Sequence, residues 1–281
     1  METIRLNNGV DMPQLGFGVF QIDDLEECEK VVLQALETGY RLIDTAAAYA
    51  NEEAVGRAIK RSGIPRAELF LSTKVWVTEA TYEQTMASFE ASLEKLQTDY
   101  LDLFLIHMPL GDYHGSWRAL EELYRAGRIR AIGVCNFLED RLTDLILSHE
   151  IIPQVNQIEC HPFSQRKELR QVMAHFDIRT MAWAPFAEGR NRIFTNDLLQ
   201  SIGENYGKSA AQVILAWLRS ENIVAIPKSV HLERIQQNFD IDDFALTTAE
   251  QKHIEALDTG APLILDIQSL TDCIAKSFLR S

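Results

Sequence analysis

Short apolar runs alternate along the chain with longer stretches in which apolar residues recur every three or four positions. The short runs are typical of β-strands buried on both faces, and the longer stretches predict amphipathic helices. We predict strands at residues 15–20, 40–45, 69–76, 101–107, 129–136, 153–159, 178–185 and 223–229. The clearest helical patterns cover residues 25–39, 81–97, 116–127, 139–150, 209–221 and 247–257.

Eight strands that each lead into a helix, without a linker or low-complexity segment, predict an α/β fold. We expect a single (β/α)8 TIM barrel that forms one domain over residues 1–281. An open doubly wound sheet is the main competitor, but no GxGxxG motif follows the first strand at residues 15–20. Asn8-Gly9 lies between two short alternating runs, which predicts an N-terminal β-hairpin that closes the bottom of the barrel.

Composition narrows the classes of partner. The 281 residues are 46% hydrophobic and carry a formal net charge of −14, which argues against nucleic acid or an anionic membrane as partner. The four cysteines show no CxxC pair and no metal-ligand spacing, so we expect free thiols in a reducing compartment and no metal site. No apolar signal core or run of 18 apolar residues is present, and we expect a cytoplasmic protein.

Polar residues end six of the predicted strands. They are Asp44, Lys74, His107, Asn136, Gln157 and Lys228. A single polar strand end is more often a cap or a rim salt bridge than a functional group. Six such ends from different strands meet on one face of a barrel, however, and that face carries the active sites of barrel enzymes.

Four residues near these ends suggest proton-transfer chemistry. Asp44 and Lys74 lie on neighbouring predicted strands, so we expect them to form a buried ion pair. Tyr49 would lie beside the ammonium group, which should lower the phenol pKa from about 10 and allow the phenol to protonate an alkoxide near neutral pH. His107 could direct a neutral imidazole N–H at the substrate oxygen.

Several motifs in order along the chain resemble the aldo-keto reductase superfamily. They are "DTAAAYANEEAVG", "STKVW", "LDLFLIH", "AIGVCNF", "VNQIECHP" and "IPKSVHLERIQQN". The segments "LGFGVFQI" and "APFAEGRNRIF" are most similar to compact microbial members of the 2,5-diketogluconate reductase or methylglyoxal reductase type. The resemblance implies a catalytic tetrad of Asp44, Tyr49, Lys74 and His107.

The segment after the last predicted strand has the residue types of a phosphate site. Lys228, Ser229 and Arg234 offer two cations and a hydroxyl near a helix N-terminus, which suits the 2′-phosphate of NADPH. A solvated helix start with scattered charge is the alternative.

The resemblance extends this cofactor site. It implies that Trp183 stacks on the nicotinamide and that Asn136 and Gln157 bind its carboxamide. Val230, Gln237 and Asn238 match family contacts to the rest of NADPH.

The resemblance also marks a substrate pocket. Phe20, Trp76 and Met108 match its apolar wall together with His107, and Asn51 matches a position near the entrance. The tail at residues 266–281 departs most from the compact microbial pattern, in the region that the family uses to shape specificity.

We therefore expect NADPH-dependent reduction of aldehydes and ketones, including dicarbonyls, by a monomer that binds a small-molecule carbonyl substrate. The alternatives are a cofactor-binding regulatory or structural protein on the same fold, and an aldolase in which Lys74 forms a Schiff base.

Overall fold

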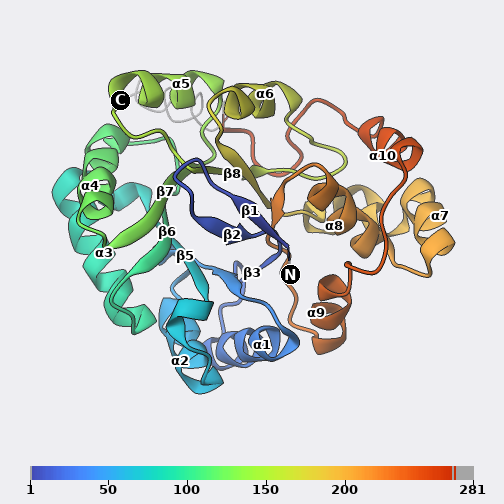
Figure 1. Cartoon of the computed structure of the whole chain (residues 1–281), viewed down its shortest axis with the longest axis horizontal. Coiled ribbons are helices and arrows are strands. Elements are labelled where there is room, and N and C mark those ends of the chain that lie inside the picture. The colour runs from blue at the N-terminus through green and yellow to red at the C-terminus, as the bar shows by residue number, and fades with distance from the viewer. Residues whose placement is uncertain (1, 268, 270–281) are drawn as a thin grey trace, which may run out of the picture.

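The computed structural model describes residues 2–267 and residue 269. Eight parallel strands run in chain order around a central barrel (Figure 1). They are β3 (Gly16–Gly18), β4 (Leu42–Asp44), β5 (Phe70–Val75), β6 (Leu101–Ile106), β7 (Ile129–Cys135), β8 (Val155–Glu159), β9 (Arg179–Trp183) and β10 (Val224–Ala225). Leu15 bridges to Ala225, and the Gly18 N–H donates to the Pro227 carbonyl at 3.1 Å. These contacts join the first and last strands and close the ring, as the sequence predicted.

Helices surround the barrel and alternate with its strands (Figure 1). They are α1 (Leu25–Thr38), α2 (Glu52–Ser62), α3 (Tyr82–Leu96), α4 (Tyr113–Arg125), α5 (Glu139–Ser148), α6 (Lys167–His175), α7 (Asp197–Tyr206), α8 (Ala210–Ser220), α9 (Leu232–Phe239) and α10 (Thr248–Glu255). Short 3₁₀ turns are η1 (Ala47–Tyr49), η2 (Arg66–Glu68) and η3 (Val77–Glu79). The segment η4 (Ala187–Thr195) consists of two turns joined by residues with non-helical backbone angles. No helix in the described part of the chain combines the length and the apolar character needed to cross a bilayer.

Alternate side chains of the strands enter two different apolar cores. Leu42, Phe70, Leu103 and Leu105 belong to the cluster inside the barrel, whereas strand residues such as Ile43 belong to the larger cluster beneath the helices. Both faces of each strand are therefore buried. This explains why the strands read as continuous apolar runs and not as an alternating pattern.

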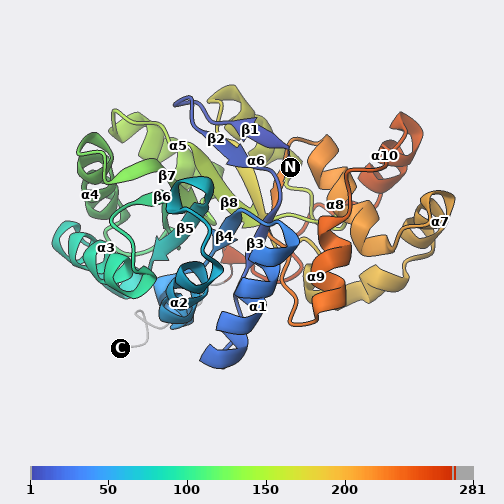
Figure 2. The same ribbon diagram turned by 60° about the horizontal axis from the view of Figure 1, so that its bottom comes forward.

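The N-terminal hairpin covers one end of the barrel. Strands β1 (Thr3–Arg5) and β2 (Asp11–Pro13) pair antiparallel and lie across that end in both views (Figures 1 and 2). Ile4, Leu6 and Met12 are buried in the same cluster as the barrel interior. The predicted hairpin is thus confirmed as the plug at the N-terminal ends of the strands, which leaves the opposite end for the site.

The structure differs from the sequence-based expectation mainly at element ends. The first and last barrel strands, predicted at 15–20 and 223–229, contain three and two residues. Pro227 has no N–H to donate to a ladder, so regular pairing of the last strand stops before it. Helices α2, α6, α7 and α9 are not among the clearest periodic patterns named above. The divergent tail at 266–281 lies almost entirely outside the described residues.

Candidate active site

An ion pair between Asp44 and Lys74 lies at the C-terminal ends of β4 and β5. Lys74 Nζ is 2.6 Å from Asp44 Oδ2 and donates to the Thr45 carbonyl at 2.8 Å. Both side chains are buried, Lys74 completely. Although burial favours the neutral amine, the charge of Asp44 and the neighbouring Tyr49 raise the pKa of Lys74 above its usual value. Lys74 is therefore a fixed cation, and the predicted buried pair is confirmed.

Two further side chains hold the Asp44 carboxylate. Ser72 Oγ donates to Asp44 Oδ1 at 2.9 Å, and Gln157 Nε2 donates to the same oxygen at 3.0 Å. One carboxylate oxygen is thus held by neutral donors and the other by Lys74. A buried carboxylate with all its neighbours donating to it keeps one orientation, and it fixes the position of the lysine.

Tyr49 lies at the end of η1, with its phenol oxygen 3.5 Å from Lys74 Nζ. The short 3₁₀ turn is closed by a hydrogen bond from the Tyr49 N–H to the Ala46 carbonyl at 3.0 Å. Ala50 follows in the left-handed region at φ 55°, which turns the chain toward α2. The three consecutive alanines therefore build a narrow loop that brings the phenol back over the lysine.

The predicted direction of the Tyr49 pKa is wrong. Burial raises the pKa of Tyr49 to about 12, and the nearby Lys74 charge only partly opposes this change. The sequence placed the ammonium correctly, but it could not show that the phenol is removed from water, which disfavours the charged tyrosinate. The phenol is protonated at neutral pH, as a proton donor must be.

His107 follows β6 directly and is held by a hydrogen bond from its own N–H to the Val75 carbonyl at 3.1 Å. Burial, together with the Lys74 charge, places the pKa of His107 well below its usual value. Its Nδ1 atom is buried and has no hydrogen-bond partner among the described residues. The ring is edge-on to Tyr49, with centroids 5.5 Å apart. The imidazole is therefore neutral, as predicted.

A cavity of about 840 Å³ opens over this group. Its walls come from the C-terminal ends of the strands and from the loops that follow them. The lining residues are Gly18, Phe20, Gln21, Asp44, Ala48, Tyr49, Trp76, His107, Met108, Cys135, Asn136, Gln157, Trp183, Ala184, Pro185, Phe186, Glu188, Gly189, Phe194, Ile226, Lys228 and Leu265. Three residues of the expected tetrad, Asp44, Tyr49 and His107, line the cavity. Lys74 does not line it but contacts Asp44 and Tyr49.

The three apolar residues expected at the substrate also line the cavity. Phe20 is 51% exposed and packs on Tyr49 with ring centroids 4.9 Å apart. Trp76 lies edge-on to His107 at 4.9 Å, and Met108 is buried beside it. The aromatic rings thus surround the phenol and the imidazole on the cavity side.

Asn136, Gln157 and Trp183 also line the cavity, next to the Asp44 and His107 group. Trp183 Nε1 donates to Asn136 Oδ1 at 2.9 Å, and Asn136 Nδ2 donates to the His107 carbonyl at 3.2 Å. Asn136 has a φ of 64°, a left-handed conformation that asparagine tolerates better than most residues. This bend turns the amide from the strand end into the cavity wall.

The segment after β10 carries the residues expected at the phosphate. Lys228 is exposed and lines the cavity, whereas the buried Ser229 hydroxyl accepts from the His231 N–H at 3.1 Å and shapes the turn before α9. Arg234 and Gln237 are exposed on α9, Asn238 is buried on it, and Val230 packs on the core. Neither Lys228 nor Arg234 forms an ion pair with any residue that the structure describes.

Asn51 does not lie at the entrance, contrary to the expectation from resemblance. It is 1% exposed, its Nδ2 donates to the carbonyls of Val19 and Ile22, and its Oδ1 accepts from Thr45 Oγ1 at 2.9 Å. Asn51 therefore ties the loop before α1 to the loop after β4. The resemblance implied an entrance position, whereas the structure shows a buried residue that joins two loops.

Several lining residues were missed by the sequence analysis. Phe186, Glu188 and Phe194 come from the loop around η4, and Leu265 comes from the C-terminal segment. The two aromatic residues of the stretch "APFAEGRNRIF" were the available signal. For Leu265 the resemblance pointed only to the adjacent C-terminal region and not to this residue, because its position depends on a distant carboxylate.

The sequence is similar to those of known proteins over most of its length. The sequence model of the Aldo/keto reductase family matches residues 14–259. A glyoxal reductase of Bacillus subtilis is 49% identical over 257 residues, which cover 91% of this chain and 92% of that protein. The methylglyoxal reductase DkgA of Escherichia coli is 42% identical over 263 residues, covering 92% and 94% of the two chains.

Solved structures extend the similarity to three dimensions. An aldo/keto reductase from Brucella melitensis has a TM-score of 0.88 and 45% identity, covering 92% of this chain and 99% of that one. An aldo-keto reductase of Bombyx mori in complex with NADP has a TM-score of 0.90 and 33% identity, covering 96% and 97%.

Proposed function

The chain belongs to the aldo/keto reductase family, and we propose that Tyr49 is the group that donates a proton to the substrate oxygen. The protein is an NADPH-dependent oxidoreductase that reduces aldehydes and ketones to alcohols. Relatives named for glyoxal and methylglyoxal reduction point to 1,2-dicarbonyl compounds as substrates. The observation that carries the mechanistic proposal is the chain of contacts from Asp44 through Lys74 to Tyr49 at the cavity.

NADPH, when bound, supplies the hydride that adds to the carbonyl carbon. The residues of the protein act on the oxygen. Tyr49 and His107 both face the cavity, so one oxygen atom can accept hydrogen bonds from the phenol and from the neutral imidazole. As negative charge develops on that oxygen, the Tyr49 proton moves to it and completes the alcohol.

Lys74 and Asp44 act through the phenol. Once its proton has left, Tyr49 is an anion in a buried site, and the Lys74 ammonium at 3.5 Å stabilises that anion. Asp44 holds the ammonium in place and balances its charge. Tyr49 then regains a proton from water before the next turnover.

The residues of the cavity fit NADPH. The amides of Asn136 and Gln157 and the indole of Trp183 lie at the barrel end beside Tyr49, where the nicotinamide must be to reach the same carbonyl. Lys228 and Arg234 have charges that no described residue neutralises, which suits the extra phosphate of NADPH over NADH. Ser229, Val230, Gln237 and Asn238 complete the proposed cofactor contacts.

We also propose that the chain works as a single-domain monomer in the cytoplasm. A regulatory or structural protein without turnover gains no support from the relatives described above. A Schiff base on Lys74 is disfavoured because its raised pKa keeps the amine protonated, whereas a nucleophilic lysine must be neutral.

The function is tested by NADPH oxidation with methylglyoxal, phenylglyoxal, p-nitrobenzaldehyde and 2,5-diketogluconate. We expect turnover with the dicarbonyl compounds and a rate about 10³-fold lower with Tyr49→Phe. NADPH should still bind this variant and quench its Trp fluorescence. An inactive wild-type protein that binds NADPH would contradict the proposed function. A fully active Tyr49→Phe would contradict the role of Tyr49 alone.

A further inference from the structure

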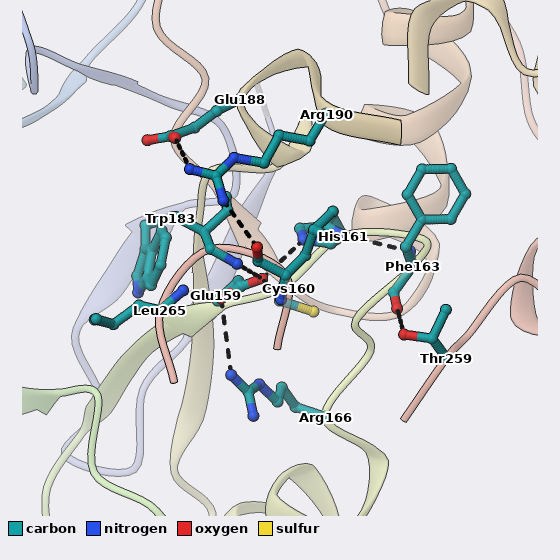
Figure 3. Close-up of polar contacts among 12 residues, drawn as sticks. Glu159, Cys160, His161, Phe163, Arg166, Trp183, Glu188, Arg190, Thr259 and Leu265 are labelled. Atoms are coloured by element: carbon teal, nitrogen blue, oxygen red, sulfur yellow. Dashed lines mark hydrogen bonds and ion pairs between the residues drawn. The ribbon is translucent and has the colours of Figure 1, made fainter. Parts of the chain in front are cut away.

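The backbone of residues 263–265 is bound to a single buried carboxylate. Glu159 ends β8, and its Oε1 accepts the N–H groups of Leu263 at 2.7 Å and Ile264 at 3.1 Å. Its Oε2 accepts the N–H of Leu265 at 3.0 Å. Figure 3 shows Glu159 between Leu265 on one side and His161 on the other. Three successive residues far along the chain thus depend on one side chain of the barrel.

The Glu159 carboxylate is ionised and held in one orientation. It is 1% exposed, a ring nitrogen of His161 lies 3.1 Å from Oε1, and Arg166 Nη2 lies 3.8 Å from Oε2. Burial alone would raise the pKa of Glu159, but hydrogen bonds from His161 and from the backbone of 263 and 265 hold it below its usual value. A buried carboxylate is costly when its partners leave, so the segment is held firmly.

One other contact holds residues 263–265, and a second holds the chain just before them. Arg190 Nη1 donates to the Leu263 carbonyl at 2.9 Å. The Thr259 hydroxyl donates to the Phe163 carbonyl at 2.8 Å (Figure 3). The segment at 263–265 contains no helix or strand of its own. Side-chain anchors therefore determine where it lies, and Glu159 supplies three of its hydrogen bonds.

The anchored segment contributes Leu265 to the wall of the active-site cavity. Leu265 lines the cavity together with Tyr49, Trp76 and His107, whereas Glu159 does not line it. We propose that Glu159 is a positioning residue for substrate selection, which fixes Leu265 as an apolar wall for the part of the substrate remote from the carbonyl. The proposal rests on the carbonyl reduction described above and adds a residue that determines which carbonyl compounds fit.

The selection follows from size. A methyl group beside the reacting carbonyl is too small to reach a remote wall, whereas a phenyl ring gains apolar contact with it. One apolar contact of this kind changes specificity by about tenfold. Glu159 should therefore influence the KM for phenylglyoxal and leave methylglyoxal reduction unchanged.

Glu159→Gln tests this inference because an amide NH2 cannot accept the N–H groups that one carboxylate oxygen accepts. We expect the KM for phenylglyoxal to rise about tenfold, with kcat and both constants for methylglyoxal within about twofold of wild type. Leu265→Ala should produce the same shift. The double variant should show no further shift, because both changes remove the same wall.

Glu121→Gln is the matched control. Glu121 is a buried carboxylate on α4 that accepts the Ile151 N–H at 3.0 Å and lies near His149 and Arg125, but it does not line the cavity. Loss of the Glu121 charge should lower stability without changing the ratio of the KM for phenylglyoxal to the KM for methylglyoxal. The proposal would be overturned if this KM ratio changed equally in Glu121→Gln and Glu159→Gln. It would also be overturned if the KM ratio of Glu159→Gln equalled that of wild type.

Hydrogen exchange of the wild-type protein tests the anchoring without any variant. The amides of Leu263, Ile264 and Leu265 should exchange at least about tenfold more slowly than an unprotected backbone amide. Exchange of all three at the unprotected rate in an active enzyme would overturn the role of Glu159 and leave the proposed function standing. A wild-type protein without carbonyl reduction would instead overturn the proposed function.

Discussion

The two ends of the barrel each bury a carboxylate beside positive charge, and they do so in different ways. At the hairpin end, Asp102 Oδ2 is 2.6 Å from Arg66 and accepts the Leu71 N–H, while Oδ1 is 2.6 Å from Arg130. At the opposite end, Asp44 pairs with one cation among the described residues, Lys74. Both carboxylates are at most 2% exposed, so burial of the anion does not distinguish them.

The cations differ. The side chains of Arg66 and Arg130 are 19% and 43% exposed, so their charges keep part of their contact with water. Lys74 is completely buried. Two of the three N–H donors of its ammonium group bind Asp44 and the Thr45 carbonyl, and the third is directed at Tyr49 beside the cavity. Desolvation of both charges makes the Asp44–Lys74 pair a poor source of stability. Under the proposed mechanism, the hairpin end uses its ion pairs for folding and the cavity end uses its pair for chemistry.

The largest expected effect on stability is at the hairpin end. Asp102→Asn removes the charge between two arginines and should lower the free energy of unfolding by about 3 kcal/mol, the lower bound for breaking a buried pair, because both guanidinium groups still reach water. Chemical denaturation measures this loss. Activity per folded molecule should not change, and a fall in kcat with intact folding would contradict the division between the two ends.

A smaller effect is expected from an exposed cation at the cavity end. Arg234→Ala should weaken NADPH binding about tenfold, since a charged hydrogen bond to the 2′-phosphate is lost, and should leave the free energy of unfolding unchanged. NADH binding serves as the control because NADH has no 2′-phosphate. Equal weakening of both cofactors would show that Arg234 does not bind that phosphate.

The smallest expected effect is that of pH. The Tyr49 phenol is protonated below its raised pKa of about 12, and His107, whose pKa is depressed, is neutral above its lowered value. Neither group therefore titrates between about pH 6.5 and pH 9, and kcat/KM for reduction should vary less than about twofold over that range. A tenfold change per pH unit within it would show that cofactor or substrate moves one of these pKa values.

The sequence predicted the positions of the site better than its electrostatics. Strand-end polar residues could be located because parallel strands of a barrel present their C-terminal ends on one face, and this rule located Asp44, Lys74 and His107. The direction of the Tyr49 pKa could not be predicted, because it depends on how much water the folded loop excludes. Spacing along the chain carries no such information.

Contacts between residues far apart in the chain also could not be predicted from the sequence. Asn51 links two loops through backbone carbonyls, and Glu159 binds a segment about a hundred residues later in the chain. Both residues stand in motifs that resemble the family, but only the folded chain shows what they contact. The same holds for Leu265, whose place in the cavity wall is a consequence of the Glu159 contacts.

The most direct test of the account is the rate of NADPH oxidation by Tyr49→Phe in a single turnover, with NADPH bound in advance and methylglyoxal in excess. Loss of the phenol removes the proton donor and nothing that the ion pair needs, so the rate should fall by about 10³-fold while the free energy of unfolding stays within about 1 kcal/mol of wild type. A rate within tenfold of wild type would contradict the assignment of chemistry to the Asp44–Lys74–Tyr49 chain.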